Sequence, residues 1–110
     1  MDNIQYSLRY LPLFYDDLEE KVLYISQELH NPTAANELID AVESAILARL
    51  PFCESFERIR SKKERKYPYY RIYVKNFVVY YVVIDDNPDQ KIMEVRRFLY
   101  KKQERLNKLV

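Results

Sequence analysis

Glycine is absent from this chain of 110 residues, and cysteine and histidine each occur once. Without glycine, every left-handed backbone position has to fall on residues such as Asn or Asp, or be avoided. The single cysteine, Cys53, excludes an internal disulfide, which favours a reducing compartment such as the cytoplasm. One Cys and one His also make no plausible zinc site, so we expect neither a metal nor a cofactor.

Long apolar segments are also missing. The longest fully apolar run has eight residues, far short of the roughly 20 that span a bilayer. The opening MDNIQYSLRY has no basic segment followed by an apolar one, so we expect no signal peptide. A hydrophobic fraction of 48% is enough for one core. We therefore expect a single domain over residues 1–110, in a soluble cytoplasmic protein that does not associate with a membrane.

The net charge of +1 conceals an asymmetry between the two halves of the chain. Residues 1–53 carry three Lys or Arg against nine Asp or Glu, a balance of −6. Residues 54–110 carry fifteen against eight, a balance of +7. This division favours a basic working face for a polyanion or an acidic partner. The alternative is that the two halves simply attract each other.

Three segments rich in Val, Ile, Tyr and Phe occupy residues 67–100, separated by KN and by DDNPDQ. This composition predicts an antiparallel three-stranded meander over Tyr69–Val74, Phe77–Asp85 and Lys91–Leu99. The run FVVYYVVI has no charge and no alternation, which predicts a central strand covered on both faces. Lys75-Asn76 suits a two-residue turn in which Asn76 takes a positive φ.

The acidic half predicts one strand and two helices. Ile4–Tyr10 alternates apolar and polar residues, which indicates a strand with one buried face. A helix should begin near Phe14 or Tyr15, with an apolar stripe of Leu18, Val22, Ile25 and Leu29. A second helix should run from about Pro32 to Leu50, capped by Asn31. Their short connection predicts an antiparallel helical hairpin.

Two further segments are basic. Phe52–Lys66 is typical of a loop or ragged strand, and Lys101–Val110 of one short helix. The predicted order, β-α-α-β-β-β, defines an α+β domain with the helical hairpin packed on one face of a twisted, mainly antiparallel four-stranded sheet. We expect the other face to be exposed and bordered by the basic loop.

Several stretches together resemble one known family. They are NPTAA at residues 31–35, LPF at 50–52, YRIYVKNFVVYY at 70–81 and RFLYKK at 97–102. Over nearly its whole length the chain is similar to the RelE/ParE superfamily of bacterial type II toxin–antitoxin toxins. The resemblance implies a RelE-like fold and a cognate antitoxin that masks the active surface.

The family includes two activities. RelE-like members cut messenger RNA in the ribosomal A site without a metal, whereas ParE-like members bind DNA gyrase and cut nothing. The resemblance leads us to expect a ribosome-dependent mRNA endonuclease, with a gyrase inhibitor that only binds, or a decayed non-toxic member, as the alternatives. Val78 stands where most RNA-cutting members carry an Arg, and this difference favours the gyrase alternative.

The resemblance also implies which residues carry the chemistry, since RNA cleavage by a ribose 2′-OH needs fixed cations and groups that move protons. The implied catalytic set is Arg71, Tyr73, Arg97, Tyr100 and Lys102. Arg71 and Lys102 would stabilise the scissile phosphate, and Tyr73 or Tyr100 would position the substrate or transfer a proton.

Further basic residues are candidates for contacts with the RNA backbone, namely Arg58, Arg60, Lys62, Lys63, Arg65, Arg96 and Lys101. Strand alternation predicts that Arg96 and Arg97 point to opposite faces, so that only one of them joins the exposed site. The sequence does not decide which one. Each of these residues also has a simpler interpretation as a solvated strand or loop residue.

Overall fold

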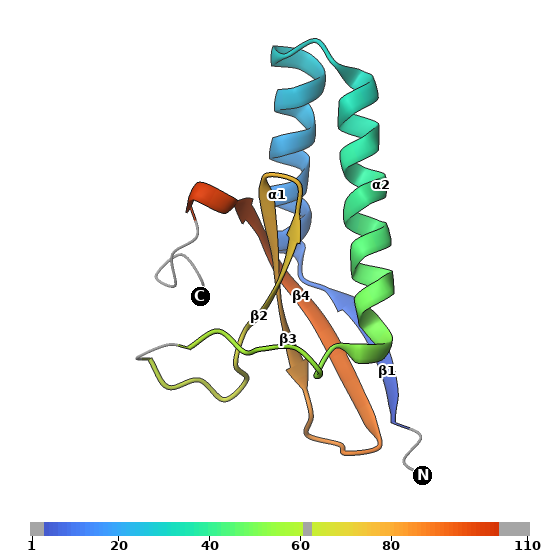
Figure 1. The fold of residues 1–110 in the computed structure, drawn as a ribbon, viewed down its shortest axis with the longest axis vertical. Helices are drawn as coiled ribbons and strands as arrows, with labels where there is room; N and C mark the ends of the chain where they lie inside the picture. Colours follow the sequence, from blue (N-terminus) through green and yellow to red (C-terminus); the bar gives the residue numbers. More distant parts are fainter. Residues whose placement is uncertain (1–3, 61–62, 104–110) are drawn as a thin grey trace.

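The computed structural model describes residues 4–60 and 63–103. Two helices pack against a four-stranded mixed sheet, so the predicted α+β class and element order are confirmed (Figure 1). The elements are β1 (Gln5–Tyr10), α1 (Pro12–Leu23), α2 (Pro32–Arg49), β2 (Tyr70–Val74), β3 (Phe77–Ile84) and β4 (Gln90–Tyr100). A π-helical turn, Tyr24–Glu28, extends α1, and 3-10 turns occupy Leu50–Phe52 and Lys101–Gln103. The rest of the predicted C-terminal helix, residues 104–110, lies outside the described residues.

The sheet has the strand order β1-β4-β3-β2. β2, β3 and β4 form the predicted antiparallel meander, and β1 joins β4 in parallel. Each residue of β3 from Phe77 to Val83 is buried, which confirms a central strand covered on both faces. The uncharged run FVVYYVVI therefore occupies the central, doubly covered strand that its composition predicts.

The main core lies between the helices and the sheet. Phe14, Leu38, Val42 and Ile46 pack there against alternate residues of the strands, among them Tyr70, Ile72, Val79, Tyr81, Val95 and Phe98. A smaller core lies on the side of the sheet away from the helices, hereafter the outer face. It comprises Tyr69, Val78, Tyr80, Val82 and Leu99, with Ile59 and Tyr67 packed against it. The expectation of an exposed outer face is wrong at its centre, because these side chains are apolar enough to favour burial.

Among residues 4–60 and 63–103, two residues with a positive φ take conformations that glycine often supplies. His30, with φ of 51°, ends the first helix in the conformation that glycine usually supplies. In the turn between β2 and β3 the positive φ belongs to Lys75, at 53°, so the assignment to Asn76 is wrong. The carbonyl of Asn76 accepts a hydrogen bond from the Lys101 N–H at 2.8 Å, which ties the turn to the end of β4. Asn31 caps α2 as predicted, accepting from the Ala34 N–H at 3.0 Å.

A buried carboxylate joins α1 to the edge of β4. β1 pairs with β4 only as far as Tyr10 and Val95, after which the chain turns into α1. Beyond that point Asp17 Oδ2 accepts the Phe98 N–H at 2.9 Å and Arg97 Nε at 2.7 Å. Asp17 thus occupies the place that a longer β1 would fill, and it supplies an acceptor for a buried backbone donor.

Replacing this carboxylate should destabilise the fold. Asp17→Ala leaves the Phe98 N–H and the Arg97 guanidinium without their acceptor, and we expect a loss of about 3 kcal/mol in the free energy of unfolding. The exposed neighbour Asp16 provides the control, since Asp16→Ala should change stability by less than about 0.5 kcal/mol. Urea unfolding followed by circular dichroism measures both variants. Equal midpoints for the two would show that the carboxylate has no structural role.

Candidate nucleic-acid interface

The antiparallel register brings three polar residues into one row across the outer face. Arg71 of β2 is the in-register partner of Tyr80 on β3, and Tyr80 is in turn the partner of Arg97 on β4. Direct partners in an antiparallel pair carry their side chains on the same face, with Cβ atoms about 5 Å apart. The row Arg71–Tyr80–Arg97 therefore places an arginine on each side of a tyrosine.

Beside this row is a group of side chains that we call the cationic patch: Arg71, Tyr73 and Lys101. The Arg71 guanidinium carbon lies 5.9 Å from the centre of the Tyr73 ring, and Lys101 Nζ lies 5.1 Å from it. Tyr73 is 51% exposed, and Lys101 is exposed as well. Cations at such distances from a ring are attracted by its negative face. The patch presents an accessible aromatic ring close to two positive charges, the combination that binds a phosphate and stacks a base.

Arg96 and Arg97 do not follow the predicted alternation. Val95 and Phe98 both pack in the core under the helices, which strict alternation would forbid for residues three apart. The irregularity is a bulge in the pairing of β3 with β4, opposite Tyr80 and Tyr81. Arg96 Nε donates to Glu94 Oε1 at 2.8 Å, and Arg97 donates to Asp17. Both arginines are therefore held by carboxylates.

Glu94 is a buried carboxylate between two arginines. It accepts from Arg96 on one side and from Arg9 Nε, at 2.9 Å, on the other. Burial alone would raise the pKa of Glu94, but the hydrogen bonds and charges of Arg96 and Arg9 outweigh it, so the pKa is lowered. The carboxylate is ionised at neutral pH and fixes the guanidinium of Arg96.

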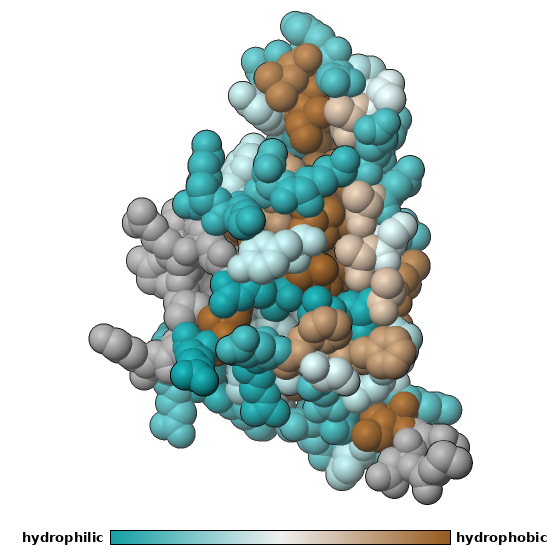
Figure 2. Space-filling view, in the orientation of Figure 1, coloured by the Kyte–Doolittle hydropathy of each residue, from teal (hydrophilic) through white to brown (hydrophobic). Residues whose placement is uncertain are grey.

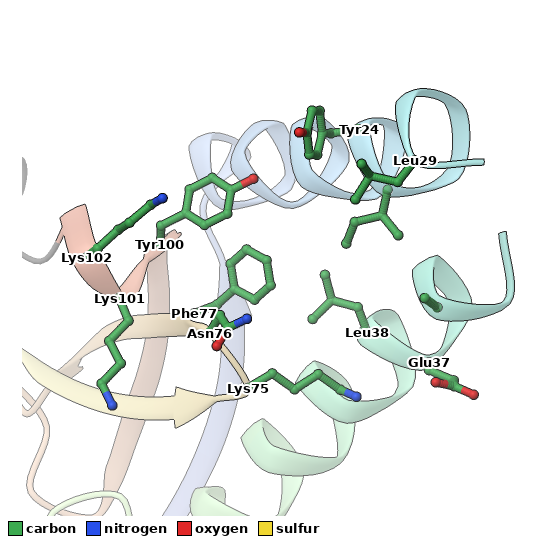
Figure 3. Close-up of a pocket in the computed structure, with 12 residues that line it drawn as sticks. Tyr24, Leu29, Glu37, Leu38, Lys75, Asn76, Phe77, Tyr100, Lys101 and Lys102 are labelled. Atoms are coloured by element: carbon green, nitrogen blue, oxygen red, sulfur yellow. The ribbon is translucent and has the colours of Figure 1, made fainter. Parts of the chain in front are cut away.

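Tyr100 and Lys102 lie on the helix side of the sheet, where they border a pocket of about 630 Å³. This helix-side pocket is lined by residues of the π-helical turn, α2, the β2–β3 turn and the end of β4: Tyr24, Ile25, Leu29, Ala34, Glu37, Leu38, Lys75, Asn76, Phe77, Tyr100, Lys101 and Lys102 (Figure 3). Figure 3 shows Lys102 beside the Tyr100 ring and Lys101 turned away from the pocket. Burial raises the pKa of Tyr100, so its hydroxyl stays protonated at neutral pH, where it can donate a hydrogen bond but cannot act as a general base.

The five predicted catalytic residues therefore do not form one group. Arg71 and Tyr73 share the cationic patch, and Arg97 belongs to the adjoining row on the outer face. Tyr100 packs against the main core, on the other side of the sheet from Arg71, and Lys102 accompanies it at the helix-side pocket.

The predicted RNA-binding residues are distributed around the second core. Arg65 and Arg96 both lie over the Tyr69 ring, at 5.0 and 5.7 Å from its centre. Arg58 donates to the Tyr70 hydroxyl at 3.2 Å, while Arg60 and Lys63 are exposed. Lys62 lies outside the described residues. Of this set, Lys101 alone belongs to the cationic patch.

Sequence reasoning missed two residues that matter to this face. Asp17 resembled an ordinary acid near a helix start, and Tyr80 resembled an ordinary core tyrosine. The hydroxyl of Tyr80 is buried and has no hydrogen-bond partner. A count of register from the Lys75-Asn76 turn would have placed Tyr80 opposite Arg71, so that signal was available.

A scan against protein-family models finds no match for this chain, and a search of the curated proteins finds none either. Within residues 4–60 and 63–103, no group of three or more His, Cys, Asp or Glu side chains is arranged to hold a metal ion. The same described part of the chain has no helix with the length and apolar character needed to cross a bilayer.

The lowered pKa of Glu94 predicts an acid-sensitive fold. A carboxyl whose pKa is lower when folded stabilises the protein above its ordinary value of 4.5, and this contribution is lost as the pH falls through the folded value. Glu94→Gln should be less stable than the wild type at pH 7 and lose less stability on acidification. Urea midpoints between about pH 3 and pH 7 measure this difference. Parallel curves for the two proteins would exclude Glu94 as a source of the acid sensitivity.

Proposed function

We propose that this chain is a RelE/ParE-type toxin that acts in the cytoplasm on ribosome-bound messenger RNA. The observation that supports the proposal is the cationic patch, in which Arg71 and Lys101 lie 5.9 and 5.1 Å from the centre of the half-exposed Tyr73 ring. An RNA strand offers a phosphate for the two cations and a base for the ring. The α+β fold, with two helices on one face of a four-stranded sheet, is compatible with a RelE-like toxin.

The proposed reaction is metal-independent cleavage of the RNA backbone. The ribose 2′-OH gives its proton to solvent water as its oxygen attacks the adjacent phosphorus. The bond to the 5′ oxygen breaks, and a cyclic phosphate remains on the upstream fragment. Negative charge grows on the phosphate oxygens, where Arg71 and Lys101 would stabilise it. The Lys101 ammonium is also a proton donor for the departing 5′ oxygen. Tyr73 would hold the base beside the scissile bond.

The second candidate function is binding without cleavage, as a DNA gyrase inhibitor. It is favoured by Val78, which is fully buried at the position where RNA-cutting members carry an arginine. It is also favoured by Arg96 and Arg97, whose guanidinium groups are bonded to Glu94 and Asp17. Such paired arginines contribute less to a phosphate than arginines aimed at it.

A translation extract separates these functions. Purified protein should produce codon-phased cuts in a message, mapped by its 5′ ends, only when ribosomes are present. Arg71→Ala should lower the cleavage rate by 100-fold or more, as the loss of one fixed charge-stabilising group typically does. Lys66→Ala is the matched control, because Lys66 is an exposed cation that pairs with Asp86 and does not belong to the patch.

Two results would contradict the proposed nuclease activity. If the message stays uncut and gyrase-dependent DNA breaks accumulate in a supercoiling assay, the protein is a gyrase inhibitor that acts by binding. Equal cleavage by Arg71→Ala and Lys66→Ala would remove the cationic patch from the reaction.

We further propose that the cognate antitoxin docks in the helix-side pocket. Tyr24 and Leu29 expose 48% and 55% of their surface at its edge, and Lys75 and Lys102 border it. Figure 2 shows apolar atoms exposed between the two helices, with hydrophilic residues on either side. An amphipathic segment with acidic residues would complement both features. π-helical turns such as Tyr24–Glu28 often occur where helices bind ligands.

Substitutions at the edge of this pocket should weaken the toxin–antitoxin complex. Leu29→Asp places a carboxylate on apolar surface that the antitoxin would cover, and we expect at least a tenfold higher dissociation constant for the product of the neighbouring reading frame. Leu47→Asp is the control, since Leu47 is 48% exposed and lies outside the pocket. Isothermal titration measures both. A larger loss for Leu47→Asp would move the docking site elsewhere on α2.

A further inference from the structure

Tyr80 combines near-complete burial with a hydroxyl that bonds nothing. Its side chain is 1% exposed, and no hydrogen-bond partner lies within reach of its oxygen. The adjacent Tyr81 is equally buried, but its hydroxyl donates to the Cys53 carbonyl at 2.8 Å and accepts from Arg49 at 3.0 Å. The hydroxyls of Tyr6 and Tyr70 are also bonded, to Glu54 and Arg58.

An unbonded buried hydroxyl destabilises the fold, because burial removes its hydrogen bonds to water and no protein group replaces them. Phenylalanine has the same shape without this penalty, and it would suit the second core. A buried hydroxyl without a partner is therefore a candidate binding group. Its surroundings indicate which kind of ligand it would bind.

One cation lies close to the Tyr80 hydroxyl. Arg71 and Arg97 are the in-register partners of Tyr80 on the two neighbouring strands, and Arg97 is paired with Asp17. Burial raises the pKa of Tyr80 to about 12, and the charge of Arg71 partly offsets this effect. The hydroxyl is therefore protonated at neutral pH and available as a donor. A donor beside a cation suits an oxyanion, since hydrogen bonds to charged oxygens are the stronger kind.

We propose that the Tyr80 hydroxyl is a phosphate-binding group of the outer face, donating a hydrogen bond to a phosphate oxygen of RNA that Arg71 also holds. This inference rests on the proposed function and extends it to a residue of the second core. Arg71 is half-buried and its charge acts on the Tyr80 hydroxyl, so a phosphate that Arg71 holds would lie near this donor.

Two tyrosine-to-phenylalanine variants test this inference. The probe is a short 2′-O-methyl RNA, which can be bound but not cut, and fluorescence anisotropy measures its affinity. Tyr80→Phe should unfold at the same or a higher urea concentration than the wild type, while binding the RNA about tenfold more weakly. Tyr81→Phe should show the reverse pattern, with lower stability because Arg49 and Cys53 lose their partner, and with unchanged RNA affinity.

The outcomes separate this inference from the proposed function. If the wild type binds the RNA and Tyr80→Phe binds it equally well, the hydroxyl does not contact the phosphate and the inference fails alone. If Tyr80→Phe is less stable than the wild type without RNA, the hydroxyl already has a partner, such as an ordered water, and the inference again fails. If the wild type itself binds no RNA, the outer face holds no RNA phosphate and the inference fails, while the translation extract still decides the proposed function.

Discussion

The arrangement of this domain depends on which group accepts the backbone hydrogen bond of β4 beyond the point where β1 ends. Three residues beyond Val95, which forms the last pair with Tyr10, the structure needs an acceptor for the Phe98 N–H, and Asp17 supplies it from α1. The same carboxylate binds Arg97, so one side chain attaches the first helix to the sheet and neutralises a cation. This attachment holds the helical hairpin on one face of the sheet, and Arg71 of β2 lies on the other.

Much of the fold could be predicted from the sequence because its signals are local. The uncharged run of β3, the turn at Lys75-Asn76 and the Asn31 cap each depend on a few neighbouring residues. The bulge near Arg96 and Arg97 depends instead on how β4 pairs with β3, which no local pattern records. The role of Asp17 depends on where β1 stops, and an acid in an early helical turn carries no sign of it. The site was accordingly less predictable than the fold.

Two adjacent lysines that directly follow β4, Lys101 and Lys102, lie on opposite sides of the sheet. Lys101 lies over the Tyr73 ring of the cationic patch, and Lys102 lies beside Tyr100 at the helix-side pocket (Figure 3). The Lys101 backbone is also bonded to Asn76 in the turn that borders the same pocket. A partner bound at Lys102 in the pocket would therefore be next to Lys101 of the cationic patch. Inhibition would then require no long-range conformational change, because an acidic segment near Lys102 also attracts Lys101.

Whether this face can cleave RNA or only bind a partner depends on whether its cations are held in fixed positions around a phosphate. Catalysis of phosphate cleavage needs cations fixed where charge develops, whereas binding to a protein needs only a complementary surface. Asp17 and Glu94 hold Arg97 and Arg96 in place, and this pairing lowers their net charge while fixing their positions. The row through Tyr80 lies between one such paired arginine and Arg71, so a phosphate there would meet one cation whose charge a carboxylate already offsets. Such a site suits cleavage if Arg71 is held where negative charge develops on the phosphate, and it suits binding alone if Arg71 is held elsewhere.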